Sequence, residues 1–172
     1  MTVAKSYQEC SAAKILVGII YITMPEMRVI IPNEVFAILE WEEDQLPAVC
    51  VVNQSLANFS PKIVFAWHLS IIVEFADLVG NGMPSIEEKS VVDQIGKVFD
   101  VNLKAGGNAL LLARITWNGT RQTLYRVCDP ELANAFLMGI IDNETQVRPF
   151  EFKMEHDPDW ELANHFLKQW AT

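Results

Sequence analysis

The sequence predicts an α+β domain of the ferredoxin-like class, a split βαβ sandwich (βαββαβ) with an N-terminal β-hairpin and an extra C-terminal helix. Three observations predict it. Strand and helix patterns alternate in this order from residue 62 onward, a sharp hairpin signal lies mid-chain, and two proline-initiated helix starts follow. The 172 residues, of which 51% are hydrophobic, suffice for one domain with its own core.

The domain is expected to begin near Glu34 with a hairpin. The segments FAILEWEE and AVCVVNQ have strand composition, and residues 44–47 form a polar corner between them. We therefore assign residues 34–172 to a single α+β domain and residues 1–33 to an N-terminal extension of uncertain structure. The apolar run from Ala12 to Ile22 is too short for a bilayer span, which needs about 20 residues. We interpret this run as a buried strand or short helix, and an alternative is that Met27 is the natural start.

The next strand is predicted from Lys62 to Phe75, where apolar side chains recur at every second position. One face would carry Ile63, Phe65, Trp67, Leu69, Ile71, Val73 and Phe75, and the other His68, Ser70 and Glu74. We expect helices to cover the first face. The N-terminal hairpin and the terminal helix, with Trp160, Phe166 and Trp170, are expected to cover part of the opposite face.

A helix is predicted after Pro84. Ser85 and Glu88 have the spacing of a capping box, in which each side chain accepts from the other residue's backbone N–H. An apolar stripe with helical spacing indicates one buried face: Ile86, Val91, Val92, Ile95, Val98 and Phe99.

A second hairpin is predicted around Asn118-Gly119, the dipeptide favoured in type I′ turns. With a two-residue turn, one side pairs Thr116 with Arg121, Arg114 with Thr123 and Leu112 with Tyr125.

Two further helices are predicted to begin at Asp129-Pro130 and Asp157-Pro158, each with an N-cap acceptor followed by proline. The segment from Gln146 to Met154 between them alternates apolar and polar residues. Because Pro149 lacks an N–H for a ladder, we expect this strand at the edge of the sheet.

The composition of the chain indicates which kinds of partner are not expected. The net charge of −9 repels phosphate backbones, so nucleic acid is not expected as a partner. The residues Cys10, Cys50 and Cys128 are odd in number and widely separated, which predicts reduced thiols. A cytoplasmic protein is expected because the N-terminal apolar run has the features of a signal peptide only in part. His68, His156 and His165 have no close ligand neighbours, so no metal is predicted, and no motif indicates a cofactor.

One polar cluster is a candidate ligand- or partner-binding site. The hairpin register gathers Arg114, Thr116, Arg121 and Tyr125 on one face, and Glu151 is included as a candidate member. Such a group could hold a carboxylate or phosphate. The alternative is a local ion-pair network in which the two arginines pair with Glu151, Glu74 or the acidic stretch from Glu40 to Asp44.

Three motifs in order resemble a bacterial family of domains of unknown function. They are Gly82-Met83-Pro84-Ser85-Ile86-Glu87-Glu88, Arg114-x-Thr116-x-x-Gly119-x-Arg121-x-x-x-Tyr125 and Glu155-x-Asp157-Pro158-x-Trp160-Glu161. Some relatives are joined to a domain similar to the ribonuclease E inhibitor called regulator of ribonuclease activity B. The resemblance covers about residues 34–170 and implies protein binding.

Two functions from different classes follow. The favoured one is a non-catalytic binding or regulatory module that acts through protein–protein contact, because catalytic motifs are missing and the net charge is strongly acidic. The alternative is a small hydrolase or transferase that acts on an anionic metabolite through Arg114, Arg121 and Tyr125, with Glu151 or Asp157 as base. A homodimer through exposed strand edges is a further expectation.

Overall fold

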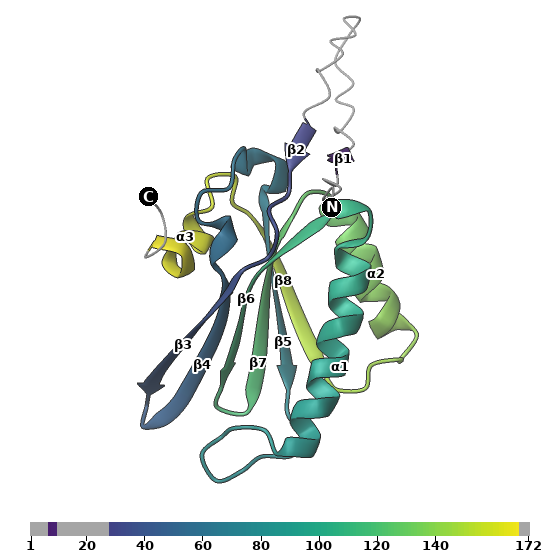
Figure 1. Ribbon diagram of the computed structural model, residues 1–172. Helices are drawn as coiled ribbons and strands as arrows, with labels where there is room; N and C mark the ends of the chain where they lie inside the picture. Colours follow the sequence, from purple (N-terminus) through teal and green to yellow (C-terminus); the bar gives the residue numbers. More distant parts are fainter. Residues whose placement is uncertain (1–6, 10–27, 169–172) are drawn as a thin grey trace, which may run out of the picture.

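The computed structural model describes residues 7–9 and 28–168, and this part of the chain forms a mixed α/β structure (Figure 1). Its main sheet contains β3 (Phe36–Glu43), β4 (Leu46–Asn53), β5 (Trp67–Glu74), β6 (Ala109–Trp117), β7 (Thr120–Val127) and β8 (Phe150–His156). The α-helices of the described residues are α1 (Ile86–Leu103), α2 (Pro130–Asp142) and α3 (Glu161–Leu167). Short 3₁₀ helices are η1 (Gln54–Leu56), η2 (Lys62–Phe65) and η3 (Ala105–Gly107).

A separate two-stranded sheet joins β1 (Tyr7–Glu9) to β2 (Arg28–Ile30). The predictions for Ala12 to Ile22, for Met27, for Cys10 and for Trp170 lie outside the described residues. The domain boundary at residue 34 stays a prediction.

The six strands are antiparallel to their neighbours and lie in the order β3-β4-β6-β7-β5-β8. Two edges result, β3 at one side and β8 at the other, so the predicted edge position of the last strand is confirmed. The first hairpin is also confirmed, but it extends the sheet at β6 instead of covering a face. In Figure 1 it diverges from the part of the sheet that α1 and α2 cover.

Two apolar clusters lie on opposite faces of the sheet. On one face, α1 and α2 pack against Leu69, Ile71 and Val73 of β5 and against Phe150, Phe152 and Met154 of β8. On the other face, the terminal helix contributes as predicted: Trp160, Ala163 and Leu167 pack with Phe59 and with the inner side chains of β4 and β6.

The strand predicted from Lys62 begins only at Trp67, which corrects its first half. Residues 62–65 form η2, and Phe65 packs in the cluster on the α3 face instead of beneath α1 and α2. Its ring lies edge-on to Phe59, with ring centroids 5.6 Å apart. Ile63, predicted to be covered by the helices, is 56% exposed. The packing of Phe65 against the opposite face therefore overrides the period-two pattern.

The helix α1 begins as predicted, but its capping box is only half formed. Ser85 Oγ accepts from the Glu88 N–H at 3.1 Å. The Glu88 carboxylate instead accepts from the Ala76 N–H at 3.0 Å and pairs with Arg148. The predicted apolar stripe holds at Val92, Ile95 and Phe99, whereas Ile86 and Val98 are exposed. The buried stripe continues instead to Leu103.

Both hairpins turn through two residues. Asp44 and Gln45 have positive φ, as have Asn118 and Gly119, the conformation that type I′ turns need. Leu46 and Pro47, predicted in the corner, therefore belong to β4. The second hairpin has the predicted register from Thr116–Arg121 to Ala113–Leu124. A bulge between Leu111 and Ala113 then shifts the ladder, so Tyr125 pairs with Leu111 and not with Leu112.

The two proline-initiated helix starts differ. Asp129 caps α2 as predicted, accepting from the Glu131 and Leu132 N–H groups. At the second, the helix begins at Glu161 and not at Pro158, because residues 157–160 form a turn that places Trp160 in the core. Asp157 still accepts from the Glu161 N–H at 2.8 Å.

Two remaining expectations concern cysteines and the membrane. Cys50 is a free, buried thiol, and burial raises its pKa to about 11. Cys128 is disulfide-bonded, so the expectation of a reduced thiol there is wrong. Within the described ranges, no helix combines the length and apolar character needed to cross a bilayer.

Candidate functional site

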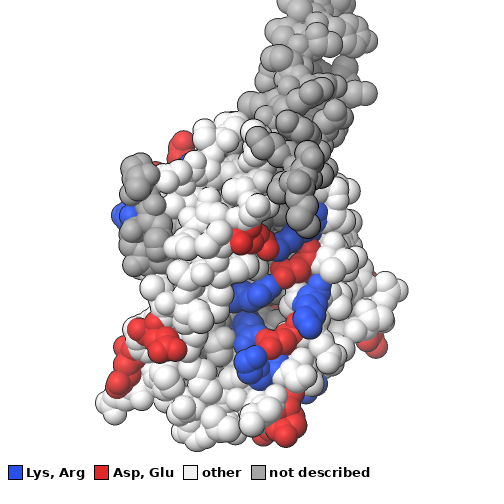
Figure 2. Space-filling view, viewed as in Figure 1, with Lys and Arg blue, Asp and Glu red and all other residues white. Residues whose placement is uncertain are grey.

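A row of charged side chains follows the edge of α1 where the helix faces β6 and β7. We call it the α1 ladder, and Figure 2 shows it as alternating basic and acidic side chains along one face. Its members from α1 are Lys89, Asp93 and Asp100, followed by Lys104 just after the helix, and its strand members are Arg114, Thr116, Arg121 and Tyr125. All four predicted hairpin residues therefore lie on the sheet face beneath α1.

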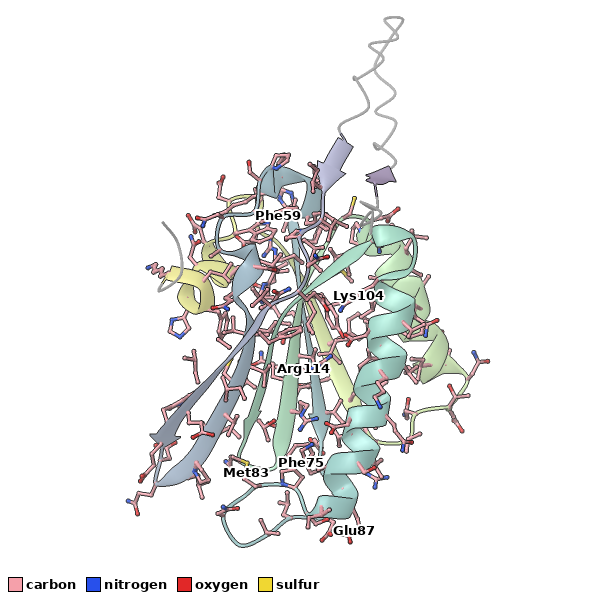
Figure 3. All side chains as sticks on the ribbon, viewed as in Figure 1. Phe59, Phe75, Met83, Glu87, Lys104 and Arg114 are labelled. Carbon is pink, nitrogen blue, oxygen red and sulfur yellow. The ribbon has the colours of Figure 1, made fainter. Side chains whose placement is uncertain are left out.

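Asp100 is the centre of the upper half of the α1 ladder. Its carboxylate accepts from Arg114 Nη2 and, at 2.6 Å, from the Tyr125 hydroxyl. Burial, together with the Asp100 charge, raises the pKa of Tyr125, so the phenol stays protonated and donates. Lys104 Nζ lies 2.7 Å from Glu34 and continues the ladder, and Figure 3 labels this lysine and Arg114.

Asp93 is the centre of the lower half of the α1 ladder. It pairs with Arg121, whose Nε also donates to Thr116 Oγ1 at 3.2 Å, and with Lys89 at 2.8 Å. Burial opposes ionisation of Asp93, but the hydrogen bonds from Lys89 and Arg121 lower its pKa. Both arginines thus have a carboxylate partner on α1.

The alternative interpretation of the arginine cluster, a local ion-pair network, describes this geometry, although the partners differ from those expected. The expected Glu151, Glu74 and residues 40–44 are replaced by Asp93 and Asp100. These aspartates are seven residues apart and so lie on one side of α1. Arg114 Nε is buried and has no hydrogen-bond partner among the described residues.

Glu151 lies on the opposite face of the sheet. It lies opposite Ile72 in the pairing of β5 with β8 and lines an open groove with His68, Ser70, Gln122 and Lys153. The sheet therefore separates Glu151 from the arginines, and the five predicted site residues do not form one site.

A buried ion pair that no motif of the sequence predicted lies at the base of β7. Arg126 Nη1 donates to Asp157 Oδ2 at 2.8 Å, Arg126 Nη2 donates to the Phe65 carbonyl at 3.1 Å, and the guanidinium lies over the Trp160 ring. Burial would raise the pKa of Asp157, but the Glu161 N–H and then Arg126 lower it. His68 Nδ1 lies 3.3 Å from Arg126 Nη1, and burial, then the Arg126 charge, lowers the pKa of His68 to about 4. Asp157 is thus a structural group.

The β3–β4 hairpin presents a surface of a different kind. On the sheet face that continues from Arg114, its β3 side chains are Ile38, Glu40 and Glu42, and Ile38 is 66% exposed. On the other face Trp41 is 40% exposed. Large apolar side chains thus alternate with carboxylates along an edge strand.

A shallow pocket opens at the tip of this hairpin. Its lining combines acidic and apolar side chains: Glu40, Trp41, Glu42, Gln45, Pro47, Ala48 and Val49. Acidic groups beside aliphatic walls match a lysine or arginine side chain, which has an apolar stem and a charged end. Among residues 7–9 and 28–168, no three His, Cys, Asp or Glu side chains are grouped so as to hold a metal ion.

A protein-family model matches most of the chain. A family model described as a family of unknown function (DUF695) matches residues 41–168. The chain belongs to this family. The DUF695 region runs from the middle of β3 to the end of α3, so it contains the α1 ladder, the Arg126–Asp157 pair and the tip of the hairpin. No curated protein and no solved structure matches the chain. An uncharacterised family was expected, and this is confirmed, whereas the link to a ribonuclease regulator stays a prediction.

Proposed function

We propose that this DUF695 protein is a non-catalytic binding or regulatory module that contacts a partner protein through the β3–β4 hairpin. The observation that carries the proposal is the exposure of apolar side chains on an edge strand, with Ile38 66% and Phe36 42% exposed. Edge strands are normally short, covered or charged throughout, because their backbone pairs readily with other chains. The other edge, β8, keeps its apolar side chains beneath the helices and turns Glu151, Lys153 and Glu155 to the other face.

The rest of the fold supports the same proposal. The unit from β5 to β8 has the strand order β6-β7-β5-β8 and the element order βαββαβ, and this order supports the proposed ferredoxin-like class. In this arrangement α1 and α2 cover one face of the sheet, and the hairpin projects beyond their cover. The resemblance to a family in which some relatives are joined to a domain similar to the regulator of ribonuclease activity B also implies protein binding. A cytoplasmic location remains part of the proposal.

The second candidate, an enzyme that acts on an anionic metabolite, has less support. Its two arginines already pair with Asp93 and Asp100. Its candidate bases lie elsewhere: Glu151 is across the sheet, and Asp157 is bonded to Arg126.

Site-specific photocrosslinking in cells tests the proposal. A benzoylphenylalanine is placed at position 41 in place of Trp41, and in a matched control at position 86, where Ile86 is 85% exposed on α1. We expect a discrete crosslinked product from position 41 that is missing from position 86 and lost when Glu40→Lys and Glu42→Lys are added. The same products from both positions, or none from position 41, would contradict the proposal.

A further inference from the structure

The backbone N–H and C=O groups on the outer side of β3 are available to a further strand. Within the described ranges, β3 pairs only with β4, so its other side has no strand partner. In an antiparallel hairpin with a two-residue turn, the residues that flank the turn, here Glu43 and Leu46, form a hydrogen-bonded pair, and the pairs then alternate. By this alternation Ile38, Glu40 and Glu42 direct their N–H and C=O groups away from β4.

Pro47 agrees with this assignment. It lies opposite Glu42, at a position where no hydrogen bond joins the two strands, so its missing N–H costs the hairpin nothing. Glu40 and Glu42, whose backbone groups point outward, also line the pocket. Backbone and side-chain recognition are therefore available together along one stretch of β3.

The negative charge around β3 indicates which kind of segment would bind there. The residues Glu40, Glu42, Glu43 and Asp44 concentrate negative charge at the tip, in a protein with a net charge of −9. A second copy of the chain would bring like charges together at this edge, which is unfavourable. A partner strand with basic residues at alternating positions would instead pair directly across from Glu40 and Glu42.

We propose that β3 takes up an extended basic segment of a partner protein as an additional strand, with a lysine or arginine side chain in the pocket formed by Glu40, Glu42, Pro47 and Val49. This inference rests on the proposed function and specifies its mode. Main-chain hydrogen bonds hold the segment, and the alternating charges set its register.

The test uses a capped peptide, Thr-Val-Lys-Val-Lys-Val-Thr, whose palindromic sequence can pair in either direction. It is titrated into the isotope-labelled full chain and followed by NMR. We expect slowed solvent exchange at the Ile38, Glu40 and Glu42 amides, which point outward, and little change at Leu39 and Trp41, which already pair with β4. The Glu40→Gln/Glu42→Gln variant is expected to weaken binding about tenfold, and Glu151→Gln/Glu155→Gln on β8 is the matched control.

Two further peptides make the test decisive. One has glutamate in place of lysine, and the other keeps both lysines but is N-methylated at the backbone amides of these two lysines, which would form hydrogen-bonded pairs with Glu40 and Glu42. If β3 recognises a strand, both fail to bind. Equal binding of the N-methylated peptide, or equal protection at Leu39 and Trp41, would overturn strand addition, because charge alone would then explain the affinity. Self-association through β3 in sedimentation experiments would overturn the assignment of the occupant.

The Ile38→Pro variant distinguishes strand addition at β3 from binding by the hairpin through side chains. Ile38→Pro removes an outward N–H and leaves the pairs with β4 intact. If the crosslinked product from position 41 persists in a folded Ile38→Pro variant, the hairpin binds its partner through side chains alone. The proposed function then stands and strand addition is wrong.

Discussion

Arg126 of β7 and Asp157, which precedes α3, form a buried ion pair whose Nη1–Oδ2 distance is 2.8 Å. The Arg126 side chain is 0% exposed, and both partners make further hydrogen bonds, to the Phe65 carbonyl and from the Glu161 N–H. This pair fixes the last helix against the sheet.

Arg126→Met is expected to destabilise the protein by about 3 kcal/mol, because it leaves the Asp157 carboxylate buried without its counter-ion. Urea unfolding measures the change. Adding Asp157→Asn, which removes the uncompensated charge and keeps an acceptor for α3, should recover part of the loss. A double variant as unstable as the sum of the two single variants would show that the groups do not interact.

His68 should make stability depend on pH. Its pKa falls from 6.5 when unfolded to about 4 in the fold, so between these values the unfolded chain binds the extra proton. The contribution of His68 is complete above pH 6.5 and is lost towards pH 4, with a slope of about 1.4 kcal/mol per pH unit. His68→Gln should flatten the curve of unfolding free energy against pH, and His165→Gln, at an exposed position, serves as control. An unchanged slope in His68→Gln would contradict the burial of a neutral imidazole.

Trp160 links η2 to α3, the last helix. Its Nε1 donates to the Lys62 and Phe65 carbonyls, each at 3.0 Å, and its ring stacks on Phe59. Trp160→Phe keeps the stacking and loses the donor, for an expected cost of about 1–2 kcal/mol. Trp160→Ala also leaves a cavity, and we expect about 3–5 kcal/mol. Thermal unfolding followed by circular dichroism distinguishes the two, and equal losses would show that the hydrogen bonds contribute nothing.

Tyr125→Phe tests the centre of the α1 ladder. The substitution removes a buried hydroxyl donor to Asp100 and should cost about 1 kcal/mol. The same change in an Asp100→Ala background should cost less, since the acceptor is gone. Chemical denaturation of the four proteins gives the coupling energy. A coupling near zero would mean that the two groups act independently.

Local patterns predicted most of the elements. Asn118-Gly119 fixed a hairpin register, and Asp129-Pro130 fixed a helix start, because each depends on a few adjacent residues. The capping role of Glu88 failed where a distant residue, Arg148, competed for the same carboxylate. Non-local competition of this kind leaves no signal in a short stretch of sequence.

The candidate site was predicted in part for the same reason. The hairpin register placed Arg114 and Arg121 together, but the helical partners were missed because only the apolar stripe of α1 was considered. The charged residues Lys89, Asp93, Lys97, Asp100 and Lys104 recur at intervals of three and four, which was a readable signal for a polar helix edge. Glu151 was misplaced because the pairing of β5 with β8 could not be known from either strand alone.

The bulge in β6 has a consequence for how chain length can vary in this strand. Leu112 and Ala113 are consecutive, yet both belong to the cluster on the α3 face, whereas Leu111 belongs to the opposite one. Deleting Leu112 would restore strict alternation, so Leu111 and Arg114 would keep their faces at the loss of one buried side chain. Deleting Ile115 instead would reverse the facing of every residue on one side of the gap. Position 112 is therefore where β6 tolerates the loss of a residue best.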